Sequence, residues 1–306
     1  MTAMPSPQQL RYLVALAEHG HFGRAATHCS VTQSTLSAGI IALEKQLAIP
    51  LLDRGAAKRP VFTAAGQEVV ARAREALNSL SAIAEIAAAE QDPLSGPLRL
   101  GVIPTVGPFL LPRLMPVLRE AFPRLRLWLR EGLTHSLTAD LAAGRLDLLL
   151  LALPASLPGA ETLALAEDPF LAALPVDHPL AEAGALSADN LAGERLLLLE
   201  DGHCLRDHAL SACRLGADRA AGVFPATSLH TLVQMVASGL GVTLLPRLAV
   251  EGGVLAGAEL RLRPLADAPG RTLGLAWRAR SSRAREFAGL AGPIRAALGA
   301  PATIPA

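Results

Sequence analysis

The 306-residue sequence lacks a long uninterrupted hydrophobic run. Its longest apolar stretch, Leu146–Leu153, contains Asp147 and ends at Pro154. It is far shorter than the roughly 20 residues that a membrane-spanning helix needs. The opening segment, Met1–Gln9, also lacks the apolar core behind a basic start that marks a secretory signal. We therefore expect a cytoplasmic protein that does not associate with a membrane.

Cysteine and lysine are both scarce. The three cysteines are Cys29, Cys204 and Cys213, and in a reducing compartment they are not expected to form permanent structural disulfides. A cysteine pair there is buried and inert, a metal site, or a redox device. Only Lys45 and Lys58 are lysines, and we attribute the preference for arginine to genomic base composition.

The net charge of +1 gives no global sign of nucleic-acid binding, and the hydrophobic fraction of 51% is sufficient for a large core. The charge is unevenly distributed, however. Residues 1–66 contain six Lys/Arg against three Asp/Glu, a local charge of +3. A modest basic head thus precedes a nearly neutral body. The whole chain is long enough for two or three domains.

Three short helices are predicted at the start of the chain. Leu10, Leu13 and Ala17 repeat at helical spacing, and Gly20 ends that segment. Short helices joined by a tight turn form the helix-turn-helix pattern, and the Gly/Lys/Arg/Pro-rich Asp53–Phe62 would be the wing of a winged variant. The predicted helices are Pro7–His19, Phe22–His28 and, after a cap at Thr32 or Ser34, a third running to about Leu47.

A long helix is predicted from Ala64 to Glu90, a stretch without proline. Such a helix is about 40 Å long, and its apolar residues alternate by three and four, as in a coiled coil. We therefore expect a homodimer through this linker helix. The alternative is a lone amphipathic helix that lies on its own domain. The seam residues are Val70, Ala73, Leu77, Leu80, Ala84 and Ala87.

The breaker cluster 92–97 is a natural hinge, after which strands alternate with helices. This alternation predicts parallel sheets covered on both faces, with a ligand cleft between two such sheets. The expected helices are Leu110–Phe122 and Ser136–Ala143. The expected strands are Leu98–Ile103, Arg124–Arg130, Leu146–Leu151, Phe170–Leu174, Arg195–Leu199, Gly222–Pro225 and Val242–Leu245.

The first 66 residues resemble the LysR family of transcription regulators. The resemblance rests on Leu10–Phe22 for the first helix, on Arg24–Ser37 for the turn and recognition helix, and on Leu43–Glu44, Leu51–Arg54 and Phe62–Gly66 beyond them. Gly239–Pro246 resembles the effector domain of the same family, so the resemblance covers nearly the whole chain.

The resemblance implies an α/β protein of three parts. They are a winged helix-turn-helix domain (1–63), a dimerisation helix (64–92) and a regulatory domain (93–306) like the periplasmic binding proteins. The regulatory domain would comprise subdomain I (93–168 and 268–306) and subdomain II (169–267). Promoter DNA would be the partner, with RNA polymerase as a further one, and the family implies a homotetramer.

Two further strings, Gly101–Pro108 and Leu198–Asp207, resemble the peroxide-sensing branch of that family, with Cys213 beyond them. This resemblance implies an activator of oxidative-stress genes, not an enzyme and without a cofactor. Cys204 lies in the first turn of a helix beside His203, where the helix dipole and a neighbouring cation favour the thiolate. A thiolate attacks hydrogen peroxide to give sulfenic acid, which condenses with a second thiol, here Cys213.

Nine positions of intact helix separate Cys204 from Cys213 by roughly 13 Å. A disulfide needs the two Cα atoms within about 7 Å. Formation of the disulfide would therefore force the intervening helix to unwind or swing, which is a physical switch. Cys29 is interpreted as a packing residue.

The resemblance also implies a peroxide pocket. Thr105 and Thr134 would hold peroxide through their hydroxyls, His203 would orient it, Asp207 would position neighbouring groups, and Arg271 would stabilise the thiolate. Each has a structural alternative. The two threonines could cap helices, the histidine could be exposed, and the arginine could lie on a surface strand.

DNA contacts are expected at the start of the recognition helix and on the wing. Short polar side chains at a helix N-terminus read base edges or phosphates, and basic wing residues follow the backbone or enter the minor groove. A plain helix cap and a solvated loop are the alternatives. Gly39 and Ile41 depart from the polar or basic residues usual in relatives, and the wing is one residue longer. The expected contacts are Thr32, Gln33, Ser34, Thr35, Arg54, Lys58 and Arg59.

Four other functions are compatible with parts of the sequence. A LysR regulator could respond to a small organic ligand in the inter-subdomain cleft, with inert cysteines. A cysteine enzyme has no use for the DNA-binding head, and a periplasmic solute-binding protein would need a signal peptide. A zinc site would require adjacent His203 and Cys204 to chelate one ion, which is difficult. Its other ligands would be His208 and Cys213.

Overall fold

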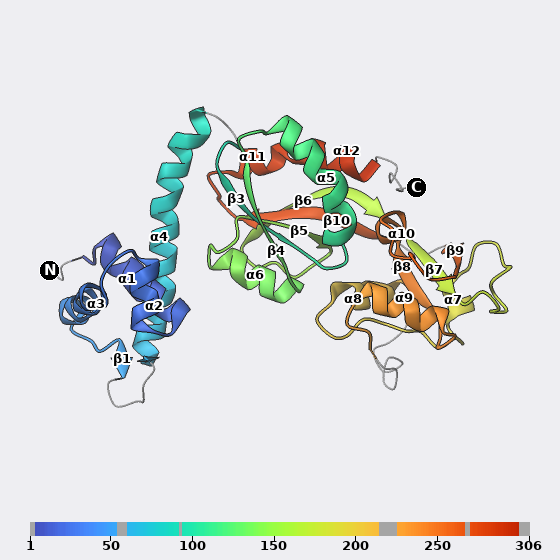
Figure 1. The fold of residues 1–306 in the computed structure, drawn as a ribbon, viewed down its shortest axis with the longest axis horizontal. Coiled ribbons are helices and arrows are strands. Elements are labelled where there is room, and N and C mark those ends of the chain that lie inside the picture. Colours follow the sequence, from blue (N-terminus) through green and yellow to red (C-terminus); the bar gives the residue numbers. More distant parts are fainter. Residues whose placement is uncertain (1–3, 54–59, 92–93, 214–224, 267–269, 300–306) are drawn as a thin grey trace. The chain divides into compact units, whose positions relative to one another are not determined.

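A computed structural model of the chain describes residues 4–53, 60–91, 94–213, 225–266 and 270–299 (Figure 1). The chain divides into two compact units, Met1–Ala88 and Ala89–Ala306. Among the described residues, no helix combines the length and the apolar character needed to cross a membrane.

The first unit begins with three helices, as predicted. They are α1 (Pro7–His19), α2 (Phe22–His28) and α3 (Gln33–Leu47). A capping box between Ser6 and Gln9 starts α1, and Gly20 ends it in the left-handed conformation at φ 58°. The Thr32 side chain caps α3 by accepting a hydrogen bond from the backbone N–H of Thr35. Local capping chemistry therefore sets the boundaries of these helices.

Gly39 has a packing role in the first unit. A Cβ atom at this position would lie 2.6 Å from Cδ2 of the Tyr12 ring. Tyr12 is buried with Leu16 and Ile40 in the core that joins the helices. The absence of a side chain at Gly39 thus lets α1 and α3 approach each other closely, which accounts for this departure from the family pattern.

The hairpin expected after α3 is present. β1 (Leu52–Asp53) pairs antiparallel with β2 (Val61–Phe62). The Glu44 carboxylate of α3 anchors its base by accepting hydrogen bonds from the backbone N–H groups of Leu51 (2.8 Å) and Leu52 (3.2 Å). The loop residues expected to contact DNA lie outside the described residues, as does the expected extra wing residue. They are Arg54, Lys58 and Arg59.

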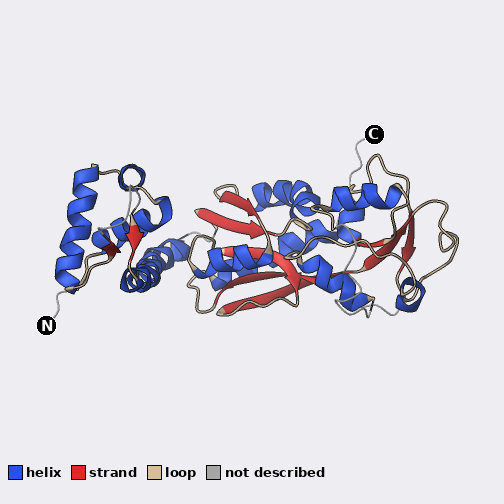
Figure 2. Ribbon diagram, turned by 90° about the horizontal axis from the view of Figure 1, so that it is seen from below, coloured by secondary structure: helices blue, strands red, loops and turns tan. Residues whose placement is uncertain are grey.

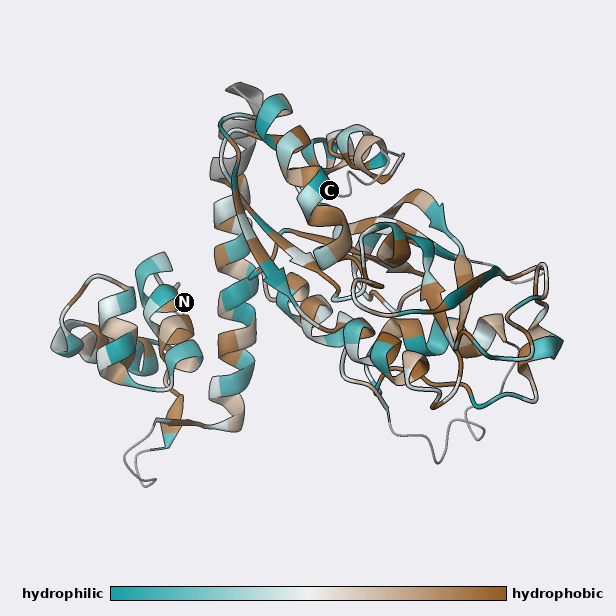
Figure 3. Cartoon of the chain, turned by 45° about the vertical axis from the view of Figure 1, so that its right-hand side comes forward, coloured by the Kyte–Doolittle hydropathy of each residue, from teal (hydrophilic) through white to brown (hydrophobic). Residues whose placement is uncertain are grey.

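The long helix α4 (Ala64–Gln91) agrees closely with the predicted span. Its first half packs on its own unit, where Val70 and Ala73 are buried. Further along, Leu80 and Ile83 are 44% and 65% exposed. Figure 3 shows hydrophobic and hydrophilic residues alternating along the helix. The helix therefore covers its own domain at one end and presents apolar side chains beyond it.

The second unit contains a five-stranded sheet in the order β4-β3-β5-β10-β6. β3 pairs parallel with β4 and β5, whereas β10 pairs antiparallel with β5 and β6. Helices lie over this sheet (Figure 2). α12 packs against α5 and β6, and α6 packs against β5 and β10. The strands are β3 (Pro97–Val102), β4 (Arg126–Glu131), β5 (Leu148–Leu153), β6 (Ala160–Asp168) and β10 (Arg271–Arg278); the helices are α5 (Gly107–Ala121), α6 (Thr134–Ala142), α11 (Ala284–Gly289) and α12 (Ala291–Gly299).

A second sheet has the order β8-β7-β9, and both of its pairings are antiparallel. Helix α9 packs against β7 and β8. The strands are β7 (Phe170–Leu174), β8 (Thr243–Pro246) and β9 (Arg261–Pro264); the helices are α7 (Ala188–Leu191), α8 (Cys204–Ala212), α9 (Leu229–Ala237) and α10 (Arg247–Glu251).

The prediction of parallel sheets is correct for β3, β4 and β5 and wrong for the other described strands of the second unit. β6 carries the chain toward the second sheet and β10 brings it back, so the two strands run in opposite directions where they pair. The expected strand Arg195–Leu199 forms only isolated parallel bridges, Leu196 with Val242 and Leu199 with Ala226. Most of the expected strand Gly222–Pro225 lies outside the described residues.

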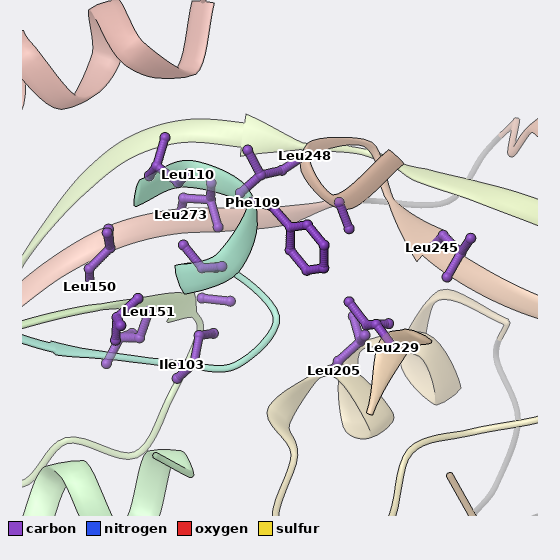
Figure 4. Packing of buried hydrophobic residues seen from close by; sticks show 14 of the residues in the cluster. Ile103, Phe109, Leu110, Leu150, Leu151, Leu205, Leu229, Leu245, Leu248 and Leu273 are labelled. Carbon is purple, nitrogen blue, oxygen red and sulfur yellow. The ribbon is translucent and has the colours of Figure 1, made fainter. Parts of the chain in front are cut away.

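One hydrophobic core connects the elements of the second unit. Figure 4 shows the Phe109 ring of α5 directed toward Leu205 and Leu229 of the α8–α9 region. The same ring stacks on His230 with 5.8 Å between centroids. The N-terminal end of α5 is thereby packed against α9 and against α8, the helix that contains Cys204.

Candidate functional site around Cys204

Cys204 is the first residue of α8, and His203 is the N-cap. Gly202 precedes them at φ 95°, a conformation that L side chains rarely adopt. The buried face of the helix, which includes Leu205 and Ala209, anchors it in the core. The sequence thus places the Cys204 thiol at a helix N-terminus, as expected.

Two hollows open on Cys204. The smaller leaves no room for a water-sized molecule. It is lined by Thr105, Thr134, His203 and Cys204 together with Ile103, Pro104, Leu133 and Gly202. The structure therefore brings three of the residues expected to form the peroxide pocket together beside Cys204, in a closed state.

The second hollow is a cavity of about 480 Å³. Thr134, Gly202 and Cys204 line it as well as the smaller one, so the thiol is reached from the larger cavity. Asp207, a fourth expected pocket residue, is exposed and lines this cavity. Its remaining lining residues are His135, Pro154, Ala155, Ser156, His208 and Ser211.

Arg271 is fully buried at the start of β10 and makes four polar contacts, two with Asp168 and two with Thr105. Its Nε and Nη2 atoms each lie 2.9 Å from Oδ2 of Asp168. Its Nη1 donates to the Thr105 hydroxyl at 2.7 Å, and its Nη2 to the Thr105 backbone oxygen at 2.9 Å. The surface alternative for Arg271 is therefore wrong.

The two threonines are not helix caps. α5 has Val106 and α6 has Leu133 as N-cap, and neither helix has a side-chain cap. Thr105 is buried and accepts a hydrogen bond from Arg271, which leaves its hydroxyl proton free to be donated. The Thr134 hydroxyl is shielded from solvent with no hydrogen-bonded oxygen or nitrogen among the described residues, and it lies where it can bond a Cys204 thiolate.

Burial raises the pKa of the Cys204 thiol above its ordinary value. The Arg271 charge and a hydrogen bond from Thr134 act in the opposite direction, and the Asp207 charge adds to the increase. The expected stabilisation of the thiolate is thus present but smaller than the cost of desolvation. In this closed state, the protonated thiol is favoured.

His203 is buried, so the exposed alternative for it is wrong. Burial lowers the pKa of its imidazole, with a smaller opposing effect of the Glu200 charge. The neutral ring can both donate and accept a hydrogen bond. His203 therefore offers the pocket a polar group without a positive charge.

Cys213 is the C-cap of α8 and is buried at the opposite end from Cys204. Burial raises the pKa of its thiol to about 11. All three cysteines are free thiols, and the helix between Cys204 and Cys213 is intact. Cys29 is half-buried against the core of the first unit, as expected of a packing residue.

Sequence reasoning missed Asp168 in this region and considered His208 only as a zinc ligand. Asp168 holds Arg271 and also accepts a hydrogen bond from the Leu248 N–H at 2.9 Å. His208 lines the larger cavity, its Nε2 lies 3.2 Å from the Pro154 carbonyl oxygen, and burial lowers its pKa. An acid at a strand end and a histidine one helical turn after Cys204 were the available signals.

The four side chains weighed for zinc do not meet in a set of close ligands within the described parts of the chain. Cys204 and Cys213 lie at opposite ends of α8, which keeps them apart. The geometry therefore gives that alternative no support.

In the first unit, the expected DNA contacts gather at the N-terminus of α3. Thr32, Gln33, Ser34 and Thr35 are all exposed. The Thr32 hydroxyl lies 2.9 Å from that of Ser34 and 2.8 Å from that of Thr35. The cluster thus caps the helix and presents polar atoms to solvent at the same time.

Comparison with known proteins agrees with both units. Residues 7–67 match the bacterial regulatory helix-turn-helix proteins of the LysR family, and residues 91–296 match the LysR substrate binding domain. The transcriptional dual regulator OxyR of Escherichia coli is 44% identical over 290 residues, 94% of each chain.

Two solved structures are similar along the whole length. Full-length OxyR from Pseudomonas aeruginosa, a cysteine variant, has a TM-score of 0.79 at 36% identity and covers 96% of this chain and 95% of its own. A hydrogen-peroxide-bound cysteine variant of Corynebacterium glutamicum OxyR has a TM-score of 0.67 at 33% identity, with 97% and 94% covered. The α/β architecture, the helix-turn-helix head and the whole-length matches together show that the chain belongs to the LysR family of transcription regulators, in its OxyR branch.

Proposed function

We propose that the protein is a transcription regulator that senses hydrogen peroxide by oxidation of Cys204 and formation of a disulfide with Cys213, and that it activates oxidative-stress genes. One observation carries the proposal. Cys204 is the first residue of α8, where a cavity, the Thr134 hydroxyl and the Arg271 charge meet at its side chain. Relatives along the whole chain are named hydrogen peroxide-inducible genes activators.

The chemistry proceeds in two balanced steps. The Cys204 thiolate attacks one oxygen of hydrogen peroxide, the O–O bond breaks, and hydroxide leaves and takes up a proton to become water. The sulfur is now a sulfenic acid. The Cys213 thiol then attacks that sulfur, a disulfide forms and a second water leaves. Hydrogen peroxide is reduced and the two thiols are oxidised.

The pocket residues act on the first step. Peroxide enters from the larger cavity and is held by the hydroxyls of Thr105 and Thr134. The Thr105 hydroxyl accepts a hydrogen bond from the Arg271 guanidinium, so the hydroxyl proton of Thr105 points away from Arg271 and can be donated to peroxide. Neutral His203 orients the peroxide, and Arg271 stabilises the thiolate, as the direction of its effect on the Cys204 pKa supports. Asp207 positions groups at the cavity rim.

The second step requires a change of fold. Helix α8 separates the two thiols by roughly 13 Å of rise, whereas a disulfide needs the Cα atoms within about 7 Å. Unwinding of α8 would disturb its packing on the core through Leu205 and Ala209. The oxidised regulatory domain would then present a different surface to its partner subunit.

DNA binding and assembly complete the proposal. Promoter DNA is contacted by Thr32, Gln33, Ser34 and Thr35 of α3. The wing residues Arg54, Lys58 and Arg59 follow the phosphates. The protein forms a homodimer through α4 and a homotetramer in the cytoplasm, with RNA polymerase as a further partner. It is not an enzyme and uses no cofactor or membrane. The parts are residues 1–63, 64–92 and 93–306, with subdomain II spanning 169–267.

A second function is favoured by the size of the larger cavity. At about 480 Å³ it exceeds what hydrogen peroxide fills and is in the range of small-ligand pockets. A LysR regulator that binds a small organic ligand there would use the same fold and would not need its cysteines.

Mass spectrometry before and after about one equivalent of hydrogen peroxide, under anaerobic handling, tests the proposal. We expect a loss of two hydrogens and a crosslinked peptide containing Cys204 and Cys213. The Cys204→Ser variant should show neither change and should lose its response to peroxide on DNA. Unmodified cysteines at that dose would exclude peroxide sensing and favour the organic ligand. A full peroxide response by Cys204→Ser would exclude Cys204 as the sensing residue.

A further inference from the structure

Three potential metal ligands meet in the first unit, outside the Cys204 site. Glu18 and His19 are the last two residues of α1, and His28 is the last residue of α2. Adjacent residues chelate one ion with difficulty, but here each of the three side chains offers one ligand atom, and these atoms all lie within 4.8 Å of one another. The left-handed turn at Gly20 reverses the chain between the two helices and so brings their ends together.

The environment favours a cation for two reasons. The C-terminal ends of two helices point to this place, and each carries a partial negative charge from its last carbonyl groups. In addition, Nε2 of His19 is shielded from solvent and has no hydrogen-bond partner within the described residues. A shielded nitrogen without a partner is uncommon in folded proteins, and a bound cation would satisfy it.

The positive charge of Arg74 beside Glu18 leaves the site intact. Arg74 of α4 lies 3.9 Å from Oε1 of Glu18, a long and partly exposed ion pair. A carboxylate has two oxygens, so Glu18 can bind a metal ion through one and still face Arg74 with the other. Arg74 would also hold the Glu18 side chain in place and orient it as a ligand.

We propose that Glu18, His19 and His28 form a site for a divalent transition-metal ion of the Zn²⁺ or Ni²⁺ type. Imidazole ligands suit these ions, whereas Mg²⁺ and Ca²⁺ prefer all-oxygen sites. Two ligand atoms on a tetrahedral zinc ion lie about 3.3 Å apart, from bond lengths near 2.0 Å. The exposed side chains of Glu18 and His28 can close the remaining gap by rotation. Water completes the coordination.

The position of the site links it to DNA binding. The ion would clamp the end of α1 to the end of α2, and α2 is followed directly by the turn into α3. Restricting the motion between these helices would hold the polar N-terminus of α3 in one orientation. Because the ion binds only the folded unit, it also raises the melting temperature as its concentration increases.

The test uses the full-length chain without a histidine tag. Cys204→Ser and Cys213→Ser are present in every sample, so that the sensing thiols cannot bind metal. Zn²⁺ and Ni²⁺ are titrated by isothermal calorimetry, and melting temperature is measured with and without Ni²⁺. We expect one ion per chain and a metal-dependent rise in melting temperature.

Variants locate the ion. His28→Ala and Glu18→Gln should each weaken binding at least about tenfold, the lower end of what loss of a mere supporting group costs. Both side chains are exposed, so the variants should fold, and circular dichroism checks this. His230→Asn, which changes an exposed histidine of the second unit, is the matched control and should bind normally. Absence of saturable binding, or unchanged binding by both His28→Ala and Glu18→Gln, would overturn the proposal.

Discussion

Arg271 donates two hydrogen bonds to Thr105, one to the hydroxyl at 2.7 Å and one to the backbone oxygen at 2.9 Å, across 166 positions of sequence. The same guanidinium is paired with Asp168 at the end of β6. The three residues therefore tie β10, β6 and the segment before α5 into one buried polar unit beside Cys204. A single side chain thus contributes to both the fold and the electrostatics of the thiol.

Replacement of Arg271 should destabilise the regulatory domain strongly. Arg271→Ala leaves the buried Asp168 carboxylate without its cation, and loss of one partner of a buried pair costs about 3–5 kcal/mol of unfolding free energy. Urea denaturation of the full-length protein measures this. The double variant Arg271→Ala/Asp168→Asn should recover part of the loss, because no buried charge remains unpaired. A loss below about 1 kcal/mol would show that the pair is dispensable.

The reaction of Cys204 should depend steeply on pH. A raised pKa means that the thiol is protonated near neutrality. As long as the pH is below this pKa, each increase of one pH unit therefore raises the fraction of reactive thiolate about tenfold. Removal of the Arg271 charge removes an effect that lowers the pKa, so Arg271→Gln should move the profile to higher pH. Alkylation rates between about pH 6.5 and 9 in a Cys29→Ser/Cys213→Ser background test both expectations.

A rate that does not change with pH in the unmodified pocket would contradict this account, since it would require a thiolate already formed at neutrality. An Arg271→Gln profile that moves to lower pH would contradict the assigned direction of the Arg271 effect. Asp207→Asn is the complementary variant. Its removal of a negative charge should move the profile to lower pH.

Two helical glycines should respond oppositely to alanine. Gly39→Ala places a Cβ atom 2.6 Å from the Tyr12 ring, and such overpacking typically costs about 1–3 kcal/mol. Gly292→Ala on α12 places its Cβ atom in open space and should gain up to about 1 kcal/mol from helix propensity. Thermal unfolding of the two variants measures the difference. If Gly39→Ala were as stable as Gly292→Ala, close packing would not be the role of Gly39.

The exposed apolar residues of α4 should mediate the dimer. Leu80→Ser/Ile83→Ser removes two side chains that are 44% and 65% exposed in the single chain. Burial of such a side chain contributes about 1.5–3 kcal/mol, so the dimer should dissociate at least about tenfold more readily. Sedimentation equilibrium measures this, with Arg72→Ser on the same helix as control. An unchanged dimer would place the interface elsewhere.

Much of this protein follows from its sequence because the relevant signals are local. The spans of α1 and α2, the Thr32 cap and the extent of α4 depend on helical periodicity and on capping residues within a few positions. The placement of Cys204 at the start of a helix has the same origin. Local backbone hydrogen bonding determines these features, and neighbouring residues encode it.

Only the tertiary structure decided the remaining features. The antiparallel entry of β10 between β5 and β6 arises because the chain returns from the second sheet, which no local pattern records. The Arg271–Thr105–Asp168 network joins residues more than a hundred positions apart. The raised pKa of Cys204 likewise reflects its burial by several distant elements, and this desolvation exceeds the opposing effects of Arg271 and Thr134.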